Sequence, residues 1–455
     1  MADSAQDQVQ IPLSTSPLLR LPRELLQHIF DEAYKEEQPP SLLCHTLAPM
    51  VIRARWQNVE IFGSTALKLF SLLKHTAPSV PPIVQSFVLE DQKCGTYPYR
   101  GPSHDADPST LRLFDVPTAV AGLSSLQSLH VKATWGLTQY VVQGLEQSGT
   151  IFNLRDLLLF SDFDQWEDPL DPNHWAFLSL HTRLKTLTIR VDGWSEGEQR
   201  PAALVSPFQS SVTDLTITYP NSRPSPTASA FAAVFPSLTT LALSIPAETP
   251  DILPDLLSAF PHPDKVTLLA VDDWCYGTSI SHILALYAGV DDLRITGCDS
   301  NEPQLFDAIR QMPNLYALEF DDETILTASH LLHLIQGPAK HPSLKLLDLN
   351  HIYSRKGASV HDYGPFWDSS ANKWTTHAGS WTLHHFTPDF PMESMEEIVE
   401  AGRRNGVKVR GSMLEAMKVQ KAFEAEEKLV AERWGNAPPP FSPGEMEYYT
   451  TKRRT

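Results

Sequence analysis

The chain has 455 residues, of which 42% are hydrophobic and 20% charged, and its mean hydropathy is −0.21. This composition excludes a wholly disordered chain, and no apolar run reaches the ~18 residues of a membrane span. The 36 basic residues against 54 acidic ones give a net charge of −18, which argues against nucleic acid and anionic membrane as main ligands. Four widely spaced cysteines and a polar N-terminus without a signal-peptide pattern predict a cytoplasmic or nuclear protein.

Residues 1–17 are predicted to be disordered, and a helical module is predicted over residues 18–62. Pro22 suits the first turn of a helix, where its missing N–H costs nothing. The apolar residues that follow recur at helical spacing and form one broad stripe. The stripe consists of Leu21, Pro22, Leu25, Leu26, Ile29 and Phe30. Residues 41–47 and 48–59 are predicted to be two further short helices.

The run Leu21-Pro22-Arg23-Glu24-Leu25-Leu26, followed by Ile29-Phe30, resembles the start of an F-box. The resemblance covers about residues 18–62 and implies that the stripe docks on a Skp-family adaptor and, through it, a cullin. A second interpretation stays open for the same helix. Repeat proteins need their apolar ends covered, so the helix could instead cap the repeats that follow it.

A repeated pattern, apolar-x-x-apolar-x-apolar, runs through the middle of the chain. From Leu126 to Leu344 it recurs at intervals of 24 to 30 residues, which is typical of a leucine-rich repeat. Each repeat is here named by its three frame residues. The frames are Val84-Phe87-Leu89, Leu126-Leu129-Val131, Leu154-Leu157-Leu159, Leu184-Leu187-Ile189, Val212-Leu215-Ile217, Leu238-Leu241-Leu243, Val266-Leu269-Val271, Val290-Leu293-Ile295, Leu315-Leu318-Phe320 and Leu344-Leu347-Leu349.

Short helices are predicted between the strands, for example over 249–260, 303–311 and 327–335. Stacking one strand and one helix per repeat predicts an α/β fold, a curved solenoid over 63–411 with its parallel sheet on the concave face. Polar inserts are expected near 91–110 and 353–380. The alternative, scattered βαβ units of a doubly wound domain, would not keep so narrow a period.

The C-terminal region has a plan of its own. A helix over 394–402 and a short strand over 407–409 are predicted to precede a C-terminal helix over 412–436. This last helix could cover the open end of the solenoid, and residues 437–455 are expected to form a flexible tail.

The sequence contains no phosphate-binding loop and no nucleophile elbow, so no catalytic residue, cofactor or metal site is predicted. His330 and His333 are spaced one helical turn apart, but no acidic third ligand accompanies them. We interpret them as ordinary structural or solvated histidines rather than metal ligands.

Residues between the inward frame positions should point away from the core, because side chains alternate along a strand. These positions are partly apolar in the early repeats and acidic in the late repeats. Aromatic residues follow several of the strands, on loops along one predicted rim of the sheet. These positions suggest a surface for a substrate segment with basic residues, although they could equally be solvated acids and packed rings. The candidate residues are Asp156, Leu158, Phe160, Asp272, Asp292, Arg294, Glu319, Asp321, Asp348, Trp135, Trp166, Trp194, Trp274 and Tyr276.

Together these patterns resemble an F-box/leucine-rich-repeat protein with degenerate repeats of the fungal type. The resemblance implies the substrate-recognition subunit of a Skp-cullin-F-box ubiquitin ligase, which itself catalyses nothing. A repeat scaffold that binds protein without any ligase link is the alternative, and an enzyme is a distant third.

Overall fold

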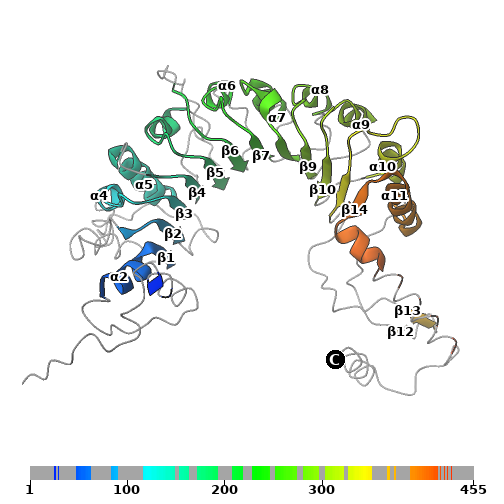
Figure 1. Ribbon diagram of the computed structural model, residues 1–455, viewed down its shortest axis with the longest axis horizontal. Helices are drawn as coiled ribbons and strands as arrows, with labels where there is room; N and C mark the ends of the chain where they lie inside the picture. Colours follow the sequence, from blue (N-terminus) through cyan, green and yellow to red (C-terminus); the bar gives the residue numbers. More distant parts are fainter. Residues whose placement is uncertain are drawn as a thin grey trace, which may run out of the picture. The chain divides into compact units, whose positions relative to one another are not determined.

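A computed structural model describes the repeats and parts of the flanking regions (Figure 1). The described residues are 25–26, 29, 48–62, 83–90, 116–148, 153–162, 172–192, 208–218, 228–245, 252–273, 280–296, 303–321, 326–350, 366–368, 373–375, 390–418, 421, 425, 428 and 432. They divide into two compact units. The first comprises Met1–Asp164 with Phe177–Thr186, and the second comprises Gln165–Ala176 with Leu187–Thr455.

The first unit contains parallel strands that neighbour one another in chain order, with helices between them. Its elements are α2 (Ala48–Gln57), β1 (Asn58–Phe62), β2 (Ser86–Glu90), α4 (Val116–Ala121), β3 (Ser128–Thr134), α5 (Trp135–Ser148) and β4 (Asp156–Asp162). Two further elements, the 3-10 helix η7 (Pro172–Leu180) and β5 (Thr186–Asp192), have residues in both units.

The second unit continues the same pattern of strand and short helix. Its elements are β6 (Asp214–Thr218), α6 (Ala228–Ala232), β7 (Thr240–Ile245), α7 (Ile252–Ala259), η8 (Pro263–Lys265), β8 (Leu268–Asp273), α8 (Ser281–Leu284), β9 (Asp292–Thr296), α9 (Pro303–Arg310), β10 (Ala317–Asp321), α10 (Ala328–Ile335), β11 (Leu346–Leu349), β12 (Phe366–Asp368), β13 (Lys373–Thr375), α11 (Met392–Asn405) and β14 (Lys408–Arg410). Strands β6 to β11 are parallel neighbours in chain order, whereas β12 and β13 form a separate antiparallel pair.

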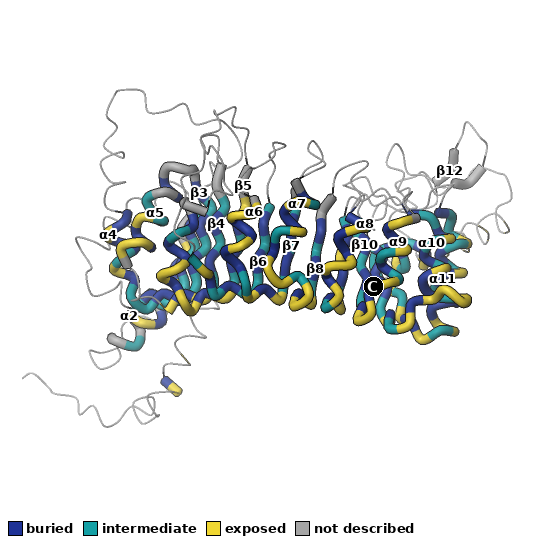
Figure 2. Tube along the Cα trace, turned by 90° about the horizontal axis from the view of Figure 1, so that it is seen from above, coloured by how far each residue is buried: buried dark blue, intermediate teal, exposed yellow. Residues whose placement is uncertain are grey.

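The register of the strands confirms the sequence frame. Leu293 on β9 lies opposite Leu269 on β8 and opposite Leu318 on β10. Every frame residue is at most 3% exposed. Fully burying one such side chain stabilises a fold by roughly 1.5–3 kcal/mol, so these ladders form the core of both units. Figure 2 shows buried positions alternating with less buried ones along the strands.

Short helices cover the buried face of the strands, which carries the frame residues. In the second unit, helices α6 to α11 lie on the outer side of a curve whose inner side is formed by the strands (Figure 1). Proline begins or precedes several of these segments, as Pro303 does at the start of α9 and Pro313 before the next frame. A proline there adds no unsatisfied N–H and prevents the helix from continuing. The parallel strands and their helices fit a leucine-rich-repeat arrangement.

Two strands lie beyond the predicted frames. The helix predicted over 48–59 ends at Gln57, and Asn58–Phe62 instead forms β1, which pairs in parallel with β2. At the other end, the short strand predicted over 407–409 is β14, and it pairs with β11. Residues 412–418 are helical as predicted, while most of 419–455 lies outside the described residues.

Candidate functional site

The strand face that points away from the helices is the candidate site. In β4, Leu157 and Leu159 are buried, whereas Asp156, Leu158 and Phe160 are only partly covered. This alternation places the three predicted early residues on the outward face, as expected from strand geometry. The outward face of a strand is therefore the part of each repeat that the core does not use.

Register groups the outward residues of the first unit into rows across β2, β3 and β4. Val88, His130 and Leu158 share one row. The next row joins Glu90, Lys132 and Phe160, and within it the Lys132 Nζ lies 3.6 Å from Glu90 Oε2. This face combines apolar, aromatic and charged side chains.

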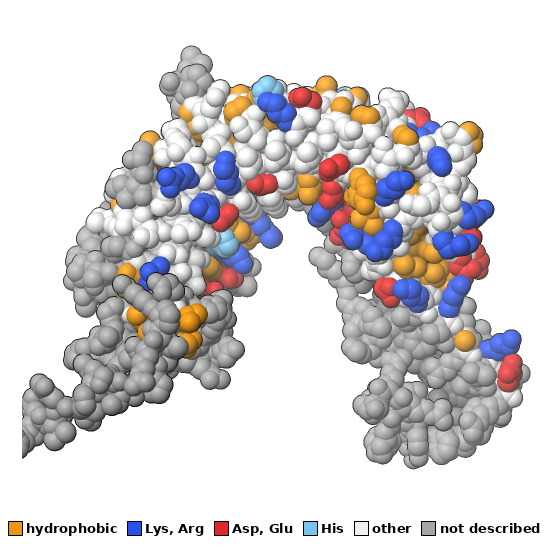
Figure 3. Space-filling view, viewed as in Figure 1, with side chains coloured by type: hydrophobic (Ala, Val, Ile, Leu, Met, Phe, Trp, Pro, Cys, Tyr) orange, Lys and Arg blue, Asp and Glu red, His pale blue; other side chains and the backbone are white. Residues whose placement is uncertain are grey.

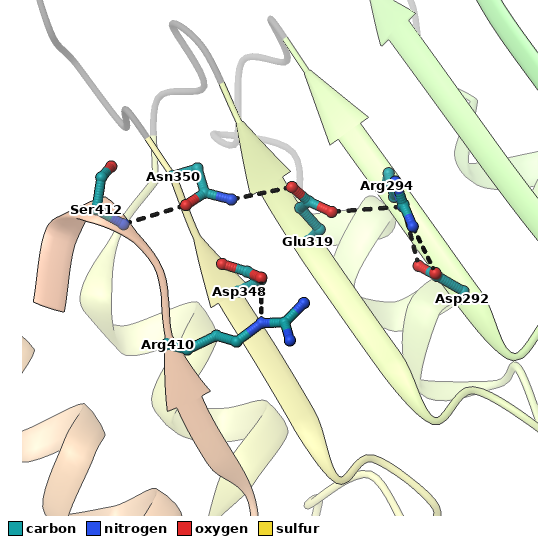
Figure 4. A network of polar contacts seen from close by, with 7 residues as sticks. All are labelled: Asp292, Arg294, Glu319, Asp348, Asn350, Arg410 and Ser412. Atoms are coloured by element: carbon teal, nitrogen blue, oxygen red, sulfur yellow. Dashed lines mark hydrogen bonds and ion pairs between the residues drawn. The ribbon is translucent and has the colours of Figure 1, made fainter. Parts of the chain in front are cut away.

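Strands β9 to β11 and β14 form a second outward face, here called the late face. One row across it consists of neighbouring register positions on four strands. The row is Arg294, Glu319, Asp348 and Arg410. Asp292 precedes Arg294 by two residues and therefore points to the same side (Figure 4).

Polar contacts connect the residues of the late face. Arg294 donates from Nε and Nη2 to the Asp292 carboxylate at 3.3 and 2.9 Å, and its Nε lies 3.4 Å from Glu319 Oε2. The hydrogen bond to Asp292 raises the pKa of Arg294 above its ordinary value. Asn350 extends the chain of contacts, since its Nδ2 donates to Glu319 Oε1 at 2.9 Å.

The C-terminal strand completes the late face. Arg410 on β14 donates from Nε to Oδ2 of Asp348, and the backbone N–H of Ser412 donates to Asn350 Oδ1 at 3.1 Å (Figure 4). The sequence alone predicts an acidic late face, because it places neither Arg294 against its two carboxylates nor β14 beside β11. The structure corrects that picture, since Arg294 and Arg410 pair with Asp292, Glu319 and Asp348.

The remaining predicted surface residues are not brought together by the described structure. Asp321 ends β10 with a partly covered side chain, and Asp272 lies in β8. Trp135 is the first residue of α5 rather than part of a loop after a strand. Three tryptophans and a tyrosine of the predicted rim lie outside the described residues. They are Trp166, Trp194, Trp274 and Tyr276.

Only half of the predicted adaptor-binding stripe is described. Leu26 is 4% exposed, whereas Leu25 and Ile29 are 51% and 44% exposed. The other three residues, Leu21, Pro22 and Phe30, lie outside the described residues. The stripe is therefore only partly placed, with two of its apolar side chains open to solvent.

The histidine pair on α10 has ordinary contacts. His330 stacks on Phe306 with ring centroids 4.7 Å apart, and its Nδ1 lies 2.8 Å from the Thr327 hydroxyl oxygen. Within the described residues, no group of three histidine, cysteine or acidic side chains is placed to hold a metal ion. The same part of the chain contains no helix that is long and apolar enough to cross a membrane.

Comparisons with known proteins do not assign this chain to a family. No protein-family model matches the sequence, and the search of curated proteins finds no match. Among solved structures, an internalin from Listeria monocytogenes matches with a TM-score of 0.27 and 14% identity, over 51% of this chain and 71% of that chain. The repeat arrangement described above rests on the strand register and the sequence frame of this chain.

Proposed function

We propose that this chain is a protein-binding repeat scaffold whose partner lies on the outward face of the second unit. One observation carries the proposal: the outward positions of β9, β10, β11 and β14 hold an ordered set of charged and polar side chains that the core does not need. A curved parallel sheet with such side chains offers a broad surface. Surfaces of this kind suit a protein partner, because solenoids use their extended faces for binding.

Site-specific crosslinking tests the proposal. A photoreactive amino acid at Ala242, which is outward-facing on β7, should crosslink to a partner in cells. The same amino acid at Glu397, exposed on α11, is the matched control and should give no such product. The captured protein should then bind the purified chain and lose that binding with Ala242→Arg. Equal crosslinking from both positions, or rebinding unaffected by Ala242→Arg, would contradict the proposal.

A second candidate function is substrate recognition in a Skp-cullin-F-box ubiquitin ligase. The exposure of Leu25 and Ile29 beside buried Leu26 favours it, because an apolar stripe left open to solvent suits a partner better than a solenoid cap. The sequence run from Leu21 to Phe30 supplies the resemblance to an F-box. In this reading the adaptor contacts the stripe and the repeats hold the substrate.

Co-purification with a Skp-family adaptor separates the two readings. The double variant Leu25→Asp, Ile29→Asp should lose adaptor and cullin. The control Leu286→Asp changes an apolar residue that is 45% exposed in the second unit, and it should retain both proteins. Failure of the wild-type chain to bind the adaptor would leave the scaffold without a ligase connection.

A further inference from the structure

On the late face, the acidic side chains are less accessible than the basic ones. The side chains of Asp292, Glu319 and Asp348 are 27%, 21% and 9% exposed. Those of Arg294 and Arg410 are 47% and 52% exposed. Figure 3 shows basic and acidic side chains close together over this part of the second unit. A partner approaching the face therefore meets the guanidinium groups of Arg294 and Arg410 before the carboxylates they pair with, although acidic residues outnumber basic ones in the sequence of these strands.

Arg410 is held through its Nε. Its Nε donates to Oδ2 of Asp348, while Nη1 and Nη2 make no hydrogen bond to any residue in the described part of the chain (Figure 4). Asp348 is buried, so this contact anchors the Nε of Arg410 at the surface of the sheet. The backbone after Arg410 is also fixed, because Ser412 donates to Asn350. An arginine oriented in this way loses little conformational entropy when it binds a ligand.

The charge around Arg410 differs from that around Arg294. Arg294 contacts two carboxylates, Asp292 and Glu319, so that group keeps a negative balance. Arg410 contacts one carboxylate, and the exposed Lys408 lies on the same strand. The β14 end of the late face therefore keeps a positive balance, and the N–H groups on Nη1 and Nη2 form a planar fork that no described residue uses. A carboxylate matches this fork in both geometry and charge.

We propose that the β14 end of the late face binds an acidic segment of a protein partner, with one carboxylate accepting from Nη1 and Nη2 of Arg410. The proposal rests on the scaffold function above and specifies the chemistry of the partner. It replaces the basic substrate segment predicted from the sequence alone, because three of the acids that suggested such a segment, Asp292, Glu319 and Asp348, pair with Arg294 and Arg410. Exposed charge pairs are screened within ~10 Å at 0.1 M salt, so the binding weakens as salt rises.

Fluorescence anisotropy with the full chain and short synthetic peptides tests this site. A glutamate-rich peptide should bind more tightly than a lysine-rich or a serine-glycine peptide of the same length. Arg410→Gln should weaken binding of the glutamate-rich peptide at least about tenfold, because a bidentate charge-assisted contact is lost. Arg403→Gln is the matched control. Arg403 is exposed on α11 and pairs with Glu400, so its replacement should leave the affinity unchanged.

A second variant separates a folding defect from loss of the site. Arg410→Lys keeps a cation beside Asp348 but cannot form the fork, so its affinity should fall between those of wild type and Arg410→Gln. Equal binding of the glutamate-rich peptide by wild type and a folded Arg410→Gln variant would overturn the proposal. Tighter binding of the lysine-rich peptide, or no binding of either charged peptide, would also overturn it. Each of these results leaves the Ala242 crosslinking test intact, so failure here is distinct from failure of the scaffold function.

Discussion

The outward faces of the two units differ although their inward faces are alike. In the first unit, β2 to β4 present Val88, Leu158 and Phe160 beside an ion pair between Lys132 and Glu90. In the second unit, the late face consists of linked ion pairs and hydrogen bonds. The frame residues beneath both faces are buried leucine, isoleucine, valine and phenylalanine.

This difference shows how a repeat separates stability from recognition. The inward positions must be apolar in every repeat, because each strand buries its neighbour's side chains as well as its own. The outward positions contribute little to the core and are free to vary from unit to unit. Substitutions on the two sides of one strand should therefore have different consequences.

The largest effect is expected from the leucine pair on β4. Leu157 is 1% exposed, and Leu157→Ala should lower the free energy of unfolding by about 2–5 kcal/mol because it leaves a cavity. Leu158 is the neighbouring residue on the outward face, and Leu158→Ala should cost under about 1 kcal/mol. Denaturant unfolding of both variants measures the difference. Similar losses would break the distinction between inward and outward positions.

A smaller effect is expected at the glycine that joins β14 to the helix after it. Gly411 has φ +109°, and an added Cβ would lie 2.4 Å from the Leu349 carbonyl oxygen and 2.7 Å from Asp348 Oδ1. Gly411→Ala should cost about 1–3 kcal/mol and loosen the late face. Gly337 has φ +80° with no atom near its added Cβ, so Gly337→Ala provides a control with backbone strain alone. Thermal unfolding should show the greater loss for Gly411→Ala.

The frame made the repeats predictable from sequence. Its three apolar positions recur in every repeat, and all of them are buried in register. The helices over 303–311 and 327–335 were predictable for a similar reason, since proline or threonine begins each and an apolar stripe follows. Local patterns of this kind are read along the chain and need no knowledge of distant contacts.

The late face was less predictable because it depends on a distant pairing. Arg410 meets Asp348 only when β14 adds to the edge of β11, across an intervening helix and an insert. A sequence pattern identifies the strand but does not give its neighbour. β1 was missed in a related way, because residues 58–62 follow a helix directly and precede the first frame. Outward charges are therefore interpretable only after the strand order is known.

Two buried histidines offer a further comparison between the units. His181 in the first unit and His341 in the second each lie three residues before a frame leucine and are 2% and 4% exposed. The Nε2 of each lies near a carbonyl oxygen of the preceding repeat, at 3.2 Å from Leu145 and 2.9 Å from Met312. Burial lowers the pKa of both side chains, with the carbonyl contact partly opposing this change.

His341 is held in one neutral form by its contacts. Its Nε2 must carry the proton, because the Met312 carbonyl can only accept a hydrogen bond. Its Nδ1 must be unprotonated, because the backbone N–H groups of Ser343 and Leu344 donate to it at 3.2 and 3.1 Å. Protonation of Nδ1 would set a third N–H against these two donors.

The smallest effect is expected at His341. Its contribution to the pH dependence of stability is absent at neutral pH and appears only in acid. With a folded pKa below the ordinary value of about 6.5, the unfolded state binds more protons as pH falls below that value. Stability is therefore full above about pH 6.5 and is lost progressively as pH falls toward the lowered folded pKa. The variant His341→Met should flatten the dependence of the urea midpoint on pH. Methionine is chosen because Met312 occupies the equivalent position in the preceding repeat. If His341→Met lost stability just as steeply with falling pH, the loss would belong to other groups. His181 in the first unit would then be the next residue to replace.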